Sequence, residues 1–431
     1  MKKVYYQLKM TQKSPLRIGN GESQSTDSDL MVDGRGFPFI PGSSLAGVLR
    51  EQYETMPAVS GENADQLFGY IDGEILENSH VIVSDAIVPE NSVPEDFTIS
   101  IRDGIGLDEW GITISGNKYD FQVVETEKSY YAVLEWTGDG DTCAKELDNG
   151  LEPLMKTIAA QGLLLGARTT RGYGSMEVEV RRKVFEFPAQ VKEWLDFDPF
   201  SADAFSDAEP VQAGTENGND VRISAVLAMK GSFSVRVSTS RMEKLEDGTV
   251  PDSRPLRNRV KKPVIPGTSW AGVFRHHMLD LLRQSGVERE SGDEAEAVNL
   301  LFGKAKEEGK HVRSKLRFHE TEITGGEAYS VTRNAVERFT QATRNTALYT
   351  NQLWQGGNGT LEIVIKDSEI TEFQKQLLAI SLIDLDLGLM TVGGESGVGR
   401  GRCTISQLTV NGQDKTEELK VQNSHFLEVK S

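Results

Sequence analysis

The sequence feature that most constrains the fold is an internal repeat. Residues 38–50 read PFIPGSSLAGVLR, and residues 263–275 read PVIPGTSWAGVFR, 225 positions later. An Asp-Ser pair precedes each segment at the same spacing, beginning at Asp27 and at Asp252. A fixed offset shared by separate motifs indicates two copies of one structural unit. We therefore expect the chain to contain two domains of the same fold.

Two further motifs follow each segment in the same order. A Leu-Phe-Gly triplet begins at Leu67 and again at Leu301, and glycine-rich stretches occupy residues 166–174 and 393–401. The two stretches, GARTTRGYG and GGESGVGRG, match in the placement of their glycines. The repeat therefore extends over most of each copy.

The segment between the copies differs from both in composition. Residues 186–220 contain nine acidic residues and one lysine, for a net charge of −8, together with several Ala, Ser, Pro and Gly residues. Such a composition is typical of a linker. We therefore predict a first domain over residues 1–185, an acidic linker over residues 186–220 and a second domain over residues 221–431.

Each copy has the element order of an α+β domain. Apolar residues at helical spacing (Leu45, Leu49 and Tyr53) follow the first Pro-Gly pair, and a later helix is predicted over roughly residues 373–389. With the intervening strands and hairpins the order is βαββαβ, so we predict two tandem modified ferredoxin-like or RNA-recognition-like domains with hairpin insertions. A sheet of this kind has an open face that can receive single-stranded RNA.

Charge and cysteine content narrow the function classes. The formal net charge is −18, which opposes phosphate binding overall, but residues 186–220 carry much of it. Basic residues cluster elsewhere, as at Arg254, Arg257 and Arg259, so net charge does not exclude nucleic acid. The sequence has two cysteines, no apolar run of membrane-spanning length and no secretion signal at its N-terminus. We expect a cytoplasmic protein with no membrane partner.

The Asp-bearing loop, the IPG[ST]S-x-x-G-x-x-R helix start and the terminal glycine loop together resemble the RAMP superfamily. Within that superfamily the chain is similar to the Cas-seven-type backbone subunits of type III CRISPR effector complexes. Because two units are fused, it resembles the doubled subunits of type III-D-like effectors. The resemblance implies three kinds of partner: CRISPR guide RNA, complementary target RNA and the other subunits of a multi-subunit complex. It also implies a thumb-like hairpin that interrupts the guide–target duplex.

In that family, an aspartate in the loop before the IPG motif supports metal-dependent cutting of target RNA. The resemblance therefore implies that Asp27 and Asp252 are catalytic, with both as candidate ligands of Mg²⁺ or another divalent cation. The loop DSDLM around Asp27 fits the family better than the more basic DSRPL around Asp252. A single Asp-Ser pair by itself favours a turn cap, and it is the duplication together with the resemblance that favours catalysis. Asp29 and Asp33 have no acidic counterparts in the second copy and are interpreted as solvated loop residues.

Helix starts, glycine loops and hairpins are predicted to contact RNA. Free N–H groups at helix N-termini and closely approaching glycine backbone bind phosphate, whereas arginines and aromatic residues in a hairpin suit base stacking. The alternatives are plain N-capping hydroxyls, tight turns and packed hairpins. In the first copy the predicted contacts are Arg17, Ser43, Ser44, Arg50, Arg102, Arg168, Arg171 and Gly172. In the second copy they are Arg236, aligned with Arg17, and Thr268, Ser269, Arg275, Arg333, Arg344, Arg400 and Arg402.

Four functions remain open on these grounds. An RNA-guided endoribonuclease with one aspartate-dependent site in each copy is favoured. A guide-RNA-binding scaffold without cleavage is the second. A guide-processing endoribonuclease is disfavoured because none of the six histidines recurs between the copies. A metabolic enzyme on the same fold has no motif in its favour, although fold alone does not exclude it.

Overall fold

The structure is a computed structural model in which the chain divides into two compact units. Unit 1 comprises Met1–Ile101, Asp120–Thr169 and Tyr173–Asn217, and unit 2 comprises Arg102–Tyr119, Thr170–Gly172 and Gly218–Ser431. The structure describes residues 1–21, 26–56, 64–72, 75–93, 97–108, 113–139, 145–214, 220–238, 248, 250–285, 293–303, 312–366 and 370–427. Within these ranges, no helix is both long and apolar enough to cross a membrane.

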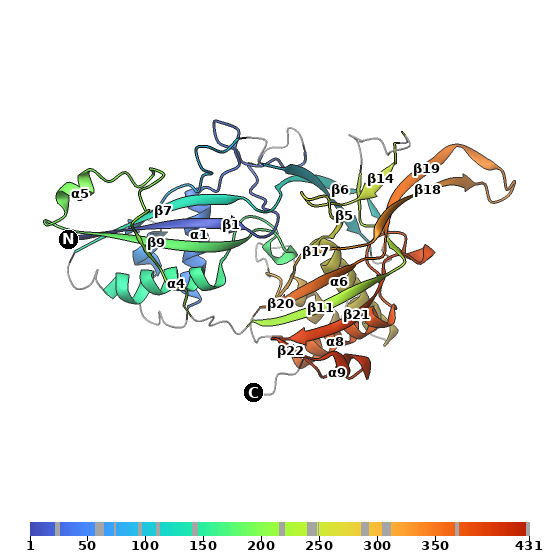
Figure 1. Cartoon of the computed structure of the whole chain (residues 1–431). Helices are drawn as coiled ribbons and strands as arrows, with labels where there is room; N and C mark the ends of the chain where they lie inside the picture. The colour runs from blue at the N-terminus through green and yellow to red at the C-terminus, as the bar shows by residue number, and fades with distance from the viewer. Residues whose placement is uncertain are drawn as a thin grey trace. The chain divides into compact units, whose positions relative to one another are not determined.

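Unit 1 is built on an antiparallel sheet in which alternate residues of the strands face a helical layer. The strands lie in the order β10 (Glu209–Pro210), β9 (Ser175–Glu186), β1 (Lys2–Gln12), β7 (Ser129–Gly138) and β4 (Val81–Val83). Helices α1 (Gly42–Glu54) and α4 (Glu152–Gln161) lie along this sheet (Figure 1). They bury Leu45, Leu49 and Ile158 with Leu8 and Leu134 of the sheet. The shorter elements of the first copy are α2 (Ala64–Phe68), β2 (Tyr70–Asp72), β3 (Ile75–Glu77), η3 (Leu147–Leu151), β8 (Leu163–Leu164), η4 (Thr169–Arg171) and α5 (Val191–Leu195).

Unit 2 repeats this arrangement. Its main sheet has the order β16 (Leu316–Phe318), β20 (Asn358–Ile365), β11 (Val221–Lys230), β21 (Arg402–Val410) and β22 (Gln413–Asp414). Helices α6 (Gly267–Gln284) and α8 (Glu372–Leu387) bury Trp270, Phe274 and Leu382 against it (Figure 1). The other elements are β12 (Ser232–Phe233), β13 (Arg236–Ser238), β14 (Ser253–Pro255), β15 (Val264–Ile265), α7 (Asp293–Phe302), β17 (Thr321–Glu322), η5 (Ser396–Val398) and α9 (Thr416–Lys420).

The repeat in the sequence is therefore a repeat in the fold. In chain order, the four principal strands are β1, β4, β7 and β9 in unit 1 and β11, β16, β20 and β21 in unit 2. In both sheets their spatial order is fourth, first, third, second. The predicted helices after the two Pro-Gly pairs and near residues 373–389 are confirmed as α1, α6 and α8. The prediction of a mixed fold of two similar domains is thus confirmed at this level.

Both predicted hairpins are present. The first is formed by β5 (Ile99–Leu107) and β6 (Thr113–Val124), and the second by β18 (Glu327–Val336) and β19 (Thr343–Gln355). The second hairpin extends far beyond the main sheet of its unit (Figure 1). At its tip the side chain of Phe339 is 96% exposed, and Arg338 and Arg344 nearby are also exposed. Residues 102–119 of the first hairpin belong to unit 2.

Much of the segment predicted to be a linker folds onto the outer face of the unit 1 sheet. Phe205 packs with Tyr5, Val133 and Phe185, and the indole N–H of Trp194 donates to the Tyr5 hydroxyl at 3.0 Å. Aromatic residues occur at short intervals in this segment, although its overall composition is acidic. The expectation of an open sheet face is accordingly wrong for this part of unit 1, because the aromatic residues cover it.

Candidate nucleic-acid interface

Asp27 is exposed and is fastened to strand β6 by a reciprocal pair of hydrogen bonds. The backbone N–H of Asp120 donates to Oδ2 of Asp27, and the N–H of Asp27 donates to Oδ1 of Asp120, both at 2.9 Å. The next residue joins the same strand, since the N–H of Gln122 donates to the Ser28 carbonyl at 3.2 Å. The loop thus presents the Asp27 carboxylate to solvent at a fixed place beside the first hairpin.

Asp252 is held in the same way in the second copy. The N–H of Thr350 on β19 donates to Oδ2 of Asp252 at 2.7 Å, and the N–H of Asp252 donates to the Thr350 carbonyl at 2.7 Å. The Ser253 hydroxyl donates to Oδ1 of Asn351 at 2.9 Å. Asp252 is also exposed, whereas Ser253 is buried. The structure therefore gives the two predicted aspartates one geometry: an exposed carboxylate anchored by a backbone N–H of the hairpin strand.

Asp120 is a residue of the first site that sequence reasoning missed. Its counterpart is Thr350, so the first site has two adjacent carboxylates where the second has one. Tyr119 and Tyr349 precede Asp120 and Thr350, and this shared tyrosine is the sequence signal that could have located Asp120.

Carboxylate oxygens suit a hard cation such as Mg²⁺, so the residue types at both sites fit the predicted ion. Across the described ranges, no three His, Cys, Asp or Glu side chains are grouped to hold a metal by themselves. Mg²⁺ commonly uses one or two protein carboxylates and completes its shell with phosphate oxygens and water. The donors at Asp27 and Asp120 match that pattern more fully than Asp252 does.

The interpretation as a solvated loop acid is wrong for Asp29. Asp29 is 8% exposed, and its Oδ1 accepts the backbone N–H and the hydroxyl of Thr26, both at 2.9 Å. Asp33 accepts the N–H groups of Arg35 and Phe37 at 2.8 and 2.9 Å. Both therefore shape the loop that presents Asp27.

The two glycine loops close identically. The N–H of Leu165 donates to the Gly174 carbonyl at 2.8 Å, and the N–H of Val392 donates to the Gly401 carbonyl at 3.0 Å. Between these ends each loop contains one 3₁₀ turn, η4 or η5. The predicted match of the two loops is confirmed.

Corresponding positions of the loops also share left-handed backbone. Arg168 and Glu395, the third residues of the two stretches, have φ angles of 64° and 61°. Gly172 and Gly399 both have a φ of 83°. A non-glycine residue rarely adopts the left-handed backbone conformation, because the conformation costs energy. Its occurrence at the third position of both loops supports the correspondence of Arg168 with Glu395.

The alignment of Arg17 with Arg236 is wrong. The carbonyl of Arg17 accepts the N–H of Ala167 at 2.8 Å, whereas the equivalent bond in unit 2 runs from the N–H of Gly394 to the carbonyl of Ser234 at 2.7 Å. Ser234 is therefore the counterpart of Arg17, and Arg236 lies two residues further on. Arg17 and Arg236 were aligned because each lies between two apolar residues, a pattern too short to fix the register.

In the first copy, arginines next to the aspartate loop pack on an aromatic ring. The guanidinium carbons of Arg17 and Arg168 lie 4.5 and 4.4 Å from the centroid of Phe121, which is itself next to Asp120. Tyr173 contacts the same ring edge to face, with centroids 6.1 Å apart. Phe121 thus holds two predicted RNA-binding arginines at the strand to which Asp27 is bonded.

The predicted N-caps of α1 are wrong. The helix begins at Gly42 after Pro41, and the N–H of Gly42 donates to the Asp85 carboxylate at 2.7 Å. Ser43 and Ser44 lie in the first turn with exposed side chains. Their hydroxyls therefore remain on the surface, where the predicted phosphate contact needs them.

Helix α6 starts in the same manner, after Pro266, with Thr268 and Ser269 half-buried in its first turn and no side-chain cap among the described residues. The motif glycines explain this start. A Cβ at Gly42 would lie 2.5 Å from the Val83 carbonyl oxygen, and one at Gly267 would lie 2.1 Å from that of Phe318. The glycine allows each helix to begin directly against a strand.

The arginines that end the repeated motif, Arg50 and Arg275, each connect their helix to the next one. Arg50 forms an ion pair with Asp65 on α2 and donates to the Gly69 carbonyl at 2.9 Å. Arg275 donates to the Asn299 side chain on α7 at 2.8 Å. The matching contacts indicate a structural reason for the repeated arginine, in contrast to the RNA contact predicted for it.

Other predicted contacts divide into buried and exposed groups. Arg102 is 2% exposed and forms an ion pair with Glu320. Arg171 donates to the Phe302 carbonyl at 3.2 Å, and Gly172 is buried. By contrast, Arg344 and Arg402 are exposed, and the RNA contacts proposed for them stay predictions.

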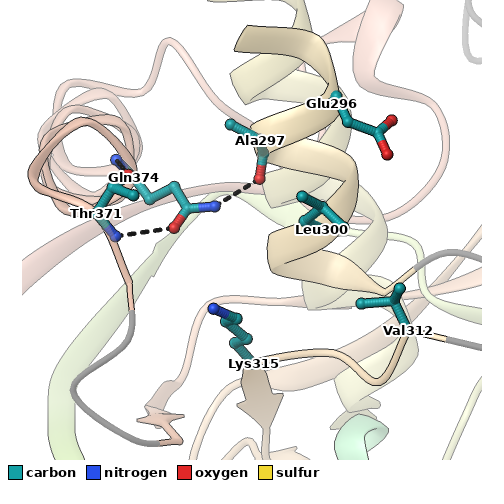
Figure 2. A pocket seen from close by; sticks show the side chains of 7 residues that line it. All are labelled: Glu296, Ala297, Leu300, Val312, Lys315, Thr371 and Gln374. Carbon is teal, nitrogen blue, oxygen red and sulfur yellow. Dashed lines mark hydrogen bonds between the residues drawn. The ribbon is translucent and has the colours of Figure 1, made fainter. Parts of the chain in front are cut away.

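A cavity of about 400 Å³ lies beside α7 and α8 in unit 2 and offers an alternative site. Figure 2 shows that the Gln374 side chain spans it, donating to the Ala297 carbonyl at 2.6 Å and accepting the Thr371 N–H at 3.0 Å. These bonds make Gln374 part of the helix cap and of the contact between the helices. The described lining residues include no nucleophile paired with a base, so the cavity does not favour a metabolic enzyme.

Comparison with known proteins identifies one family. The model described as the RAMP superfamily matches residues 9–177 and 202–404. The two matched stretches correspond to the two copies and together cover most of the chain. No protein among the curated ones matches the sequence.

Proposed function

Because this chain belongs to the RAMP superfamily, we propose that it is a doubled backbone subunit of a type III, III-D-like CRISPR effector. RAMP proteins bind RNA and work in CRISPR RNA-bound complexes of several subunits. In this role each copy holds one stretch of the guide RNA, and base pairing with the guide selects the target. The partners are guide RNA, complementary target RNA and the other subunits of the complex.

We further propose that each copy cuts the paired target once, next to Asp27 or Asp252. The observation that supports this most is the shared anchoring of two exposed carboxylates on backbone N–H groups of the hairpin strands. A turn-capping aspartate would accept bonds within its own loop, as Asp29 does from Thr26. Asp27 and Asp252 instead accept from strands remote in sequence, and an exposed carboxylate at a fixed place can orient an attacking 2′-hydroxyl or accept its proton.

A divalent cation such as Mg²⁺ belongs to this proposal. Asp27 with Asp120 in the first copy, and Asp252 in the second, would hold it. When bound, the cation supplies positive charge to neutralise the phosphate under attack. The protein residues contribute the position of the carboxylate and, through Arg17 and Arg168 beside Phe121, further positive charge near the first site.

The first test asks whether the guide-loaded protein cuts RNA at all. The protein is assembled with its guide, and labelled complementary RNA is added with and without Mg²⁺. We expect cuts that require complementarity and Mg²⁺ and that disappear in the double variant D27N/D252N, with guide binding retained. The matched control D148N removes an exposed carboxylate of η3 that takes no part in either aspartate loop, and it should cut normally.

The second candidate function is a scaffold that binds guide RNA without cutting. It would be favoured if the wild-type protein captured target RNA through the guide and left it intact. Cleavage that persisted unchanged in the double variant would contradict the assignment of the aspartates.

A further inference from the structure

One carboxylate in the second glycine loop gathers three arginines. Oε2 of Glu395 accepts from Nε of Arg400 at 2.5 Å, and the guanidinium groups of Arg236 and Arg333 lie 3.6 and 3.8 Å from its oxygens. The Asn351 amide also donates to Glu395, at 2.9 Å. Three positive charges surround one negative charge, so the cluster as a whole is positive.

The three arginines differ in what they can still bind. The Arg400 side chain is 7% exposed and also donates to the hydroxyls of Ser232 and Tyr329, at 2.7 and 2.9 Å. Arg236 and Arg333 are 40% and 35% exposed, and their contacts to Glu395 are longer. Arg400 therefore fixes Glu395 in place, whereas Arg236 and Arg333 retain surface that faces solvent.

The cluster is connected to the aspartate loop by two consecutive residues of β19. The Thr350 N–H holds the Asp252 carboxylate at 2.7 Å, and the Asn351 side chain joins Ser253 to Glu395. The glycine loop leaves room for this arrangement, because a Cβ at Gly394 would lie 3.1 Å from the Arg236 guanidinium. Arg236 and Arg333 are thus linked to the loop of Asp252 through Glu395, Asn351 and Ser253.

The corresponding residues of the first copy that the structure describes are different. At the positions of Asn351 and Glu395 it has Phe121 and Arg168, and its arginines pack on the Phe121 ring. A ring attracts a cation but does not fix the rotation of the guanidinium, whereas a carboxylate accepts particular N–H groups. In the second copy, Glu395 is the anion that can orient the arginines.

We propose that Glu395 is a positioning residue that orients Arg236 and Arg333 to bind one RNA phosphodiester beside Asp252. This inference rests on the proposed function, in that the bound RNA lies at Asp252. Arginine suits the task because its planar fork of N–H donors can hold a carboxylate on one side and a phosphate on the other. Glu395 does not itself contact the RNA.

The test compares E395Q with E417Q, a control that removes an exposed carboxylate of α9. Removing negative charge by itself should strengthen RNA binding in both variants. If Glu395 positions the two arginines, E395Q should instead weaken RNA binding. The second cut should then slow by about tenfold or more while the first is unchanged. The salt dependence of RNA binding should also weaken by roughly 0.7 in the slope of log K against log salt, as expected for one lost phosphate contact.

The binding measurement is made first with guide alone and then with target captured by the guide-loaded protein. If E395Q reduces the salt slope already with guide alone, the phosphate belongs to the guide. If the reduction appears only when target is captured, the phosphate belongs to the target. Equal slopes and equal second cuts in E395Q and E417Q would overturn the proposal.

If E395Q fails to fold, R236A serves instead, because it leaves Glu395 with Arg400 and Asn351. A wild-type protein that binds RNA without cutting would contradict the proposed function but would still allow the slopes to test Glu395.

Discussion

Replacing Asp27 by asparagine is expected to remove one of two cuts in a guide-paired target and to leave the other in place. Asparagine keeps the size of the side chain and an oxygen that can accept the Asp120 N–H, but it loses the negative charge. Loss of a carboxylate that accepts a proton or supports a cation should slow that cut by about 100-fold or more. D252N should have the reciprocal effect, because Thr350 holds Asp252 in the same manner.

The measurement for this pair is a map of target fragments at equal guide occupancy for wild type, D27N and D252N. Guide binding should stay within about twofold of wild type, because the anchoring bonds survive. The two variants act as controls for each other, since each must retain the cut that the other loses. Loss of both cuts in a single variant, or of neither, would contradict independent sites.

The second large effect concerns the backbone of the glycine loops. Gly401 has a φ of 78°, and a Cβ there would lie 2.1 Å from the Val392 carbonyl oxygen. Gly401→Ala must therefore break the bond between Val392 and Gly401 or move the strand that follows. We expect a loss of about 3 kcal/mol or more in the free energy of unfolding of unit 2, or roughly 6–12 °C in its thermal midpoint.

Gly397→Ala is the matched control in the same loop. Its φ lies outside the left-handed region, and a Cβ there would have no atom within 4 Å. It should change the unfolding free energy by no more than about 0.5 kcal/mol. Equal midpoints for the two variants in thermal or denaturant unfolding would show that the loop backbone does not constrain unit 2.

The repeated motifs predicted those parts of the fold that depend on local backbone geometry. Proline and glycine fix the start of α1 and α6, and the glycines of the two loops recur because carbonyl oxygens approach them in both copies. Periodic apolar residues then predicted which helix faces are buried. These features need few long-range contacts, which is why motif spacing was enough to find them.

Partners that are remote in sequence could not be predicted in this way. Arg50 repeats as Arg275, which favoured a functional role, but Asp65 and Asn299 account for the repetition by bracing neighbouring helices. Arg102 was likewise predicted to contact RNA, but it is buried and paired with Glu320, a residue more than 200 positions away.

The acidic segment was misjudged for a different reason. Charge dominated its composition, whereas Trp194, Phe197 and Phe205 determine where it packs. A few aromatic side chains bury enough apolar surface to order a segment whose other residues remain in water.

The two copies share one geometry but differ in electrostatics. The first has the second carboxylate of Asp120 and arginines on an aromatic ring, and the second has arginines organised by Glu395. The sequence indicated only that the surroundings of Asp252 are more basic. The structure adds the particular anions, Asp120 and Glu395, by which the sites can differ in their need for metal and in their grip on RNA.

The central claim is that two equivalent sites cut one strand that is paired to the guide. The most direct measurement is a nucleotide-resolution map of the cuts made by wild-type protein in targets whose complementary stretch is placed at different positions. We predict two cuts at a constant spacing that move in step with the complementary stretch. A single cut, or cuts that stay at fixed sequences when the complementary stretch is moved, would contradict the claim.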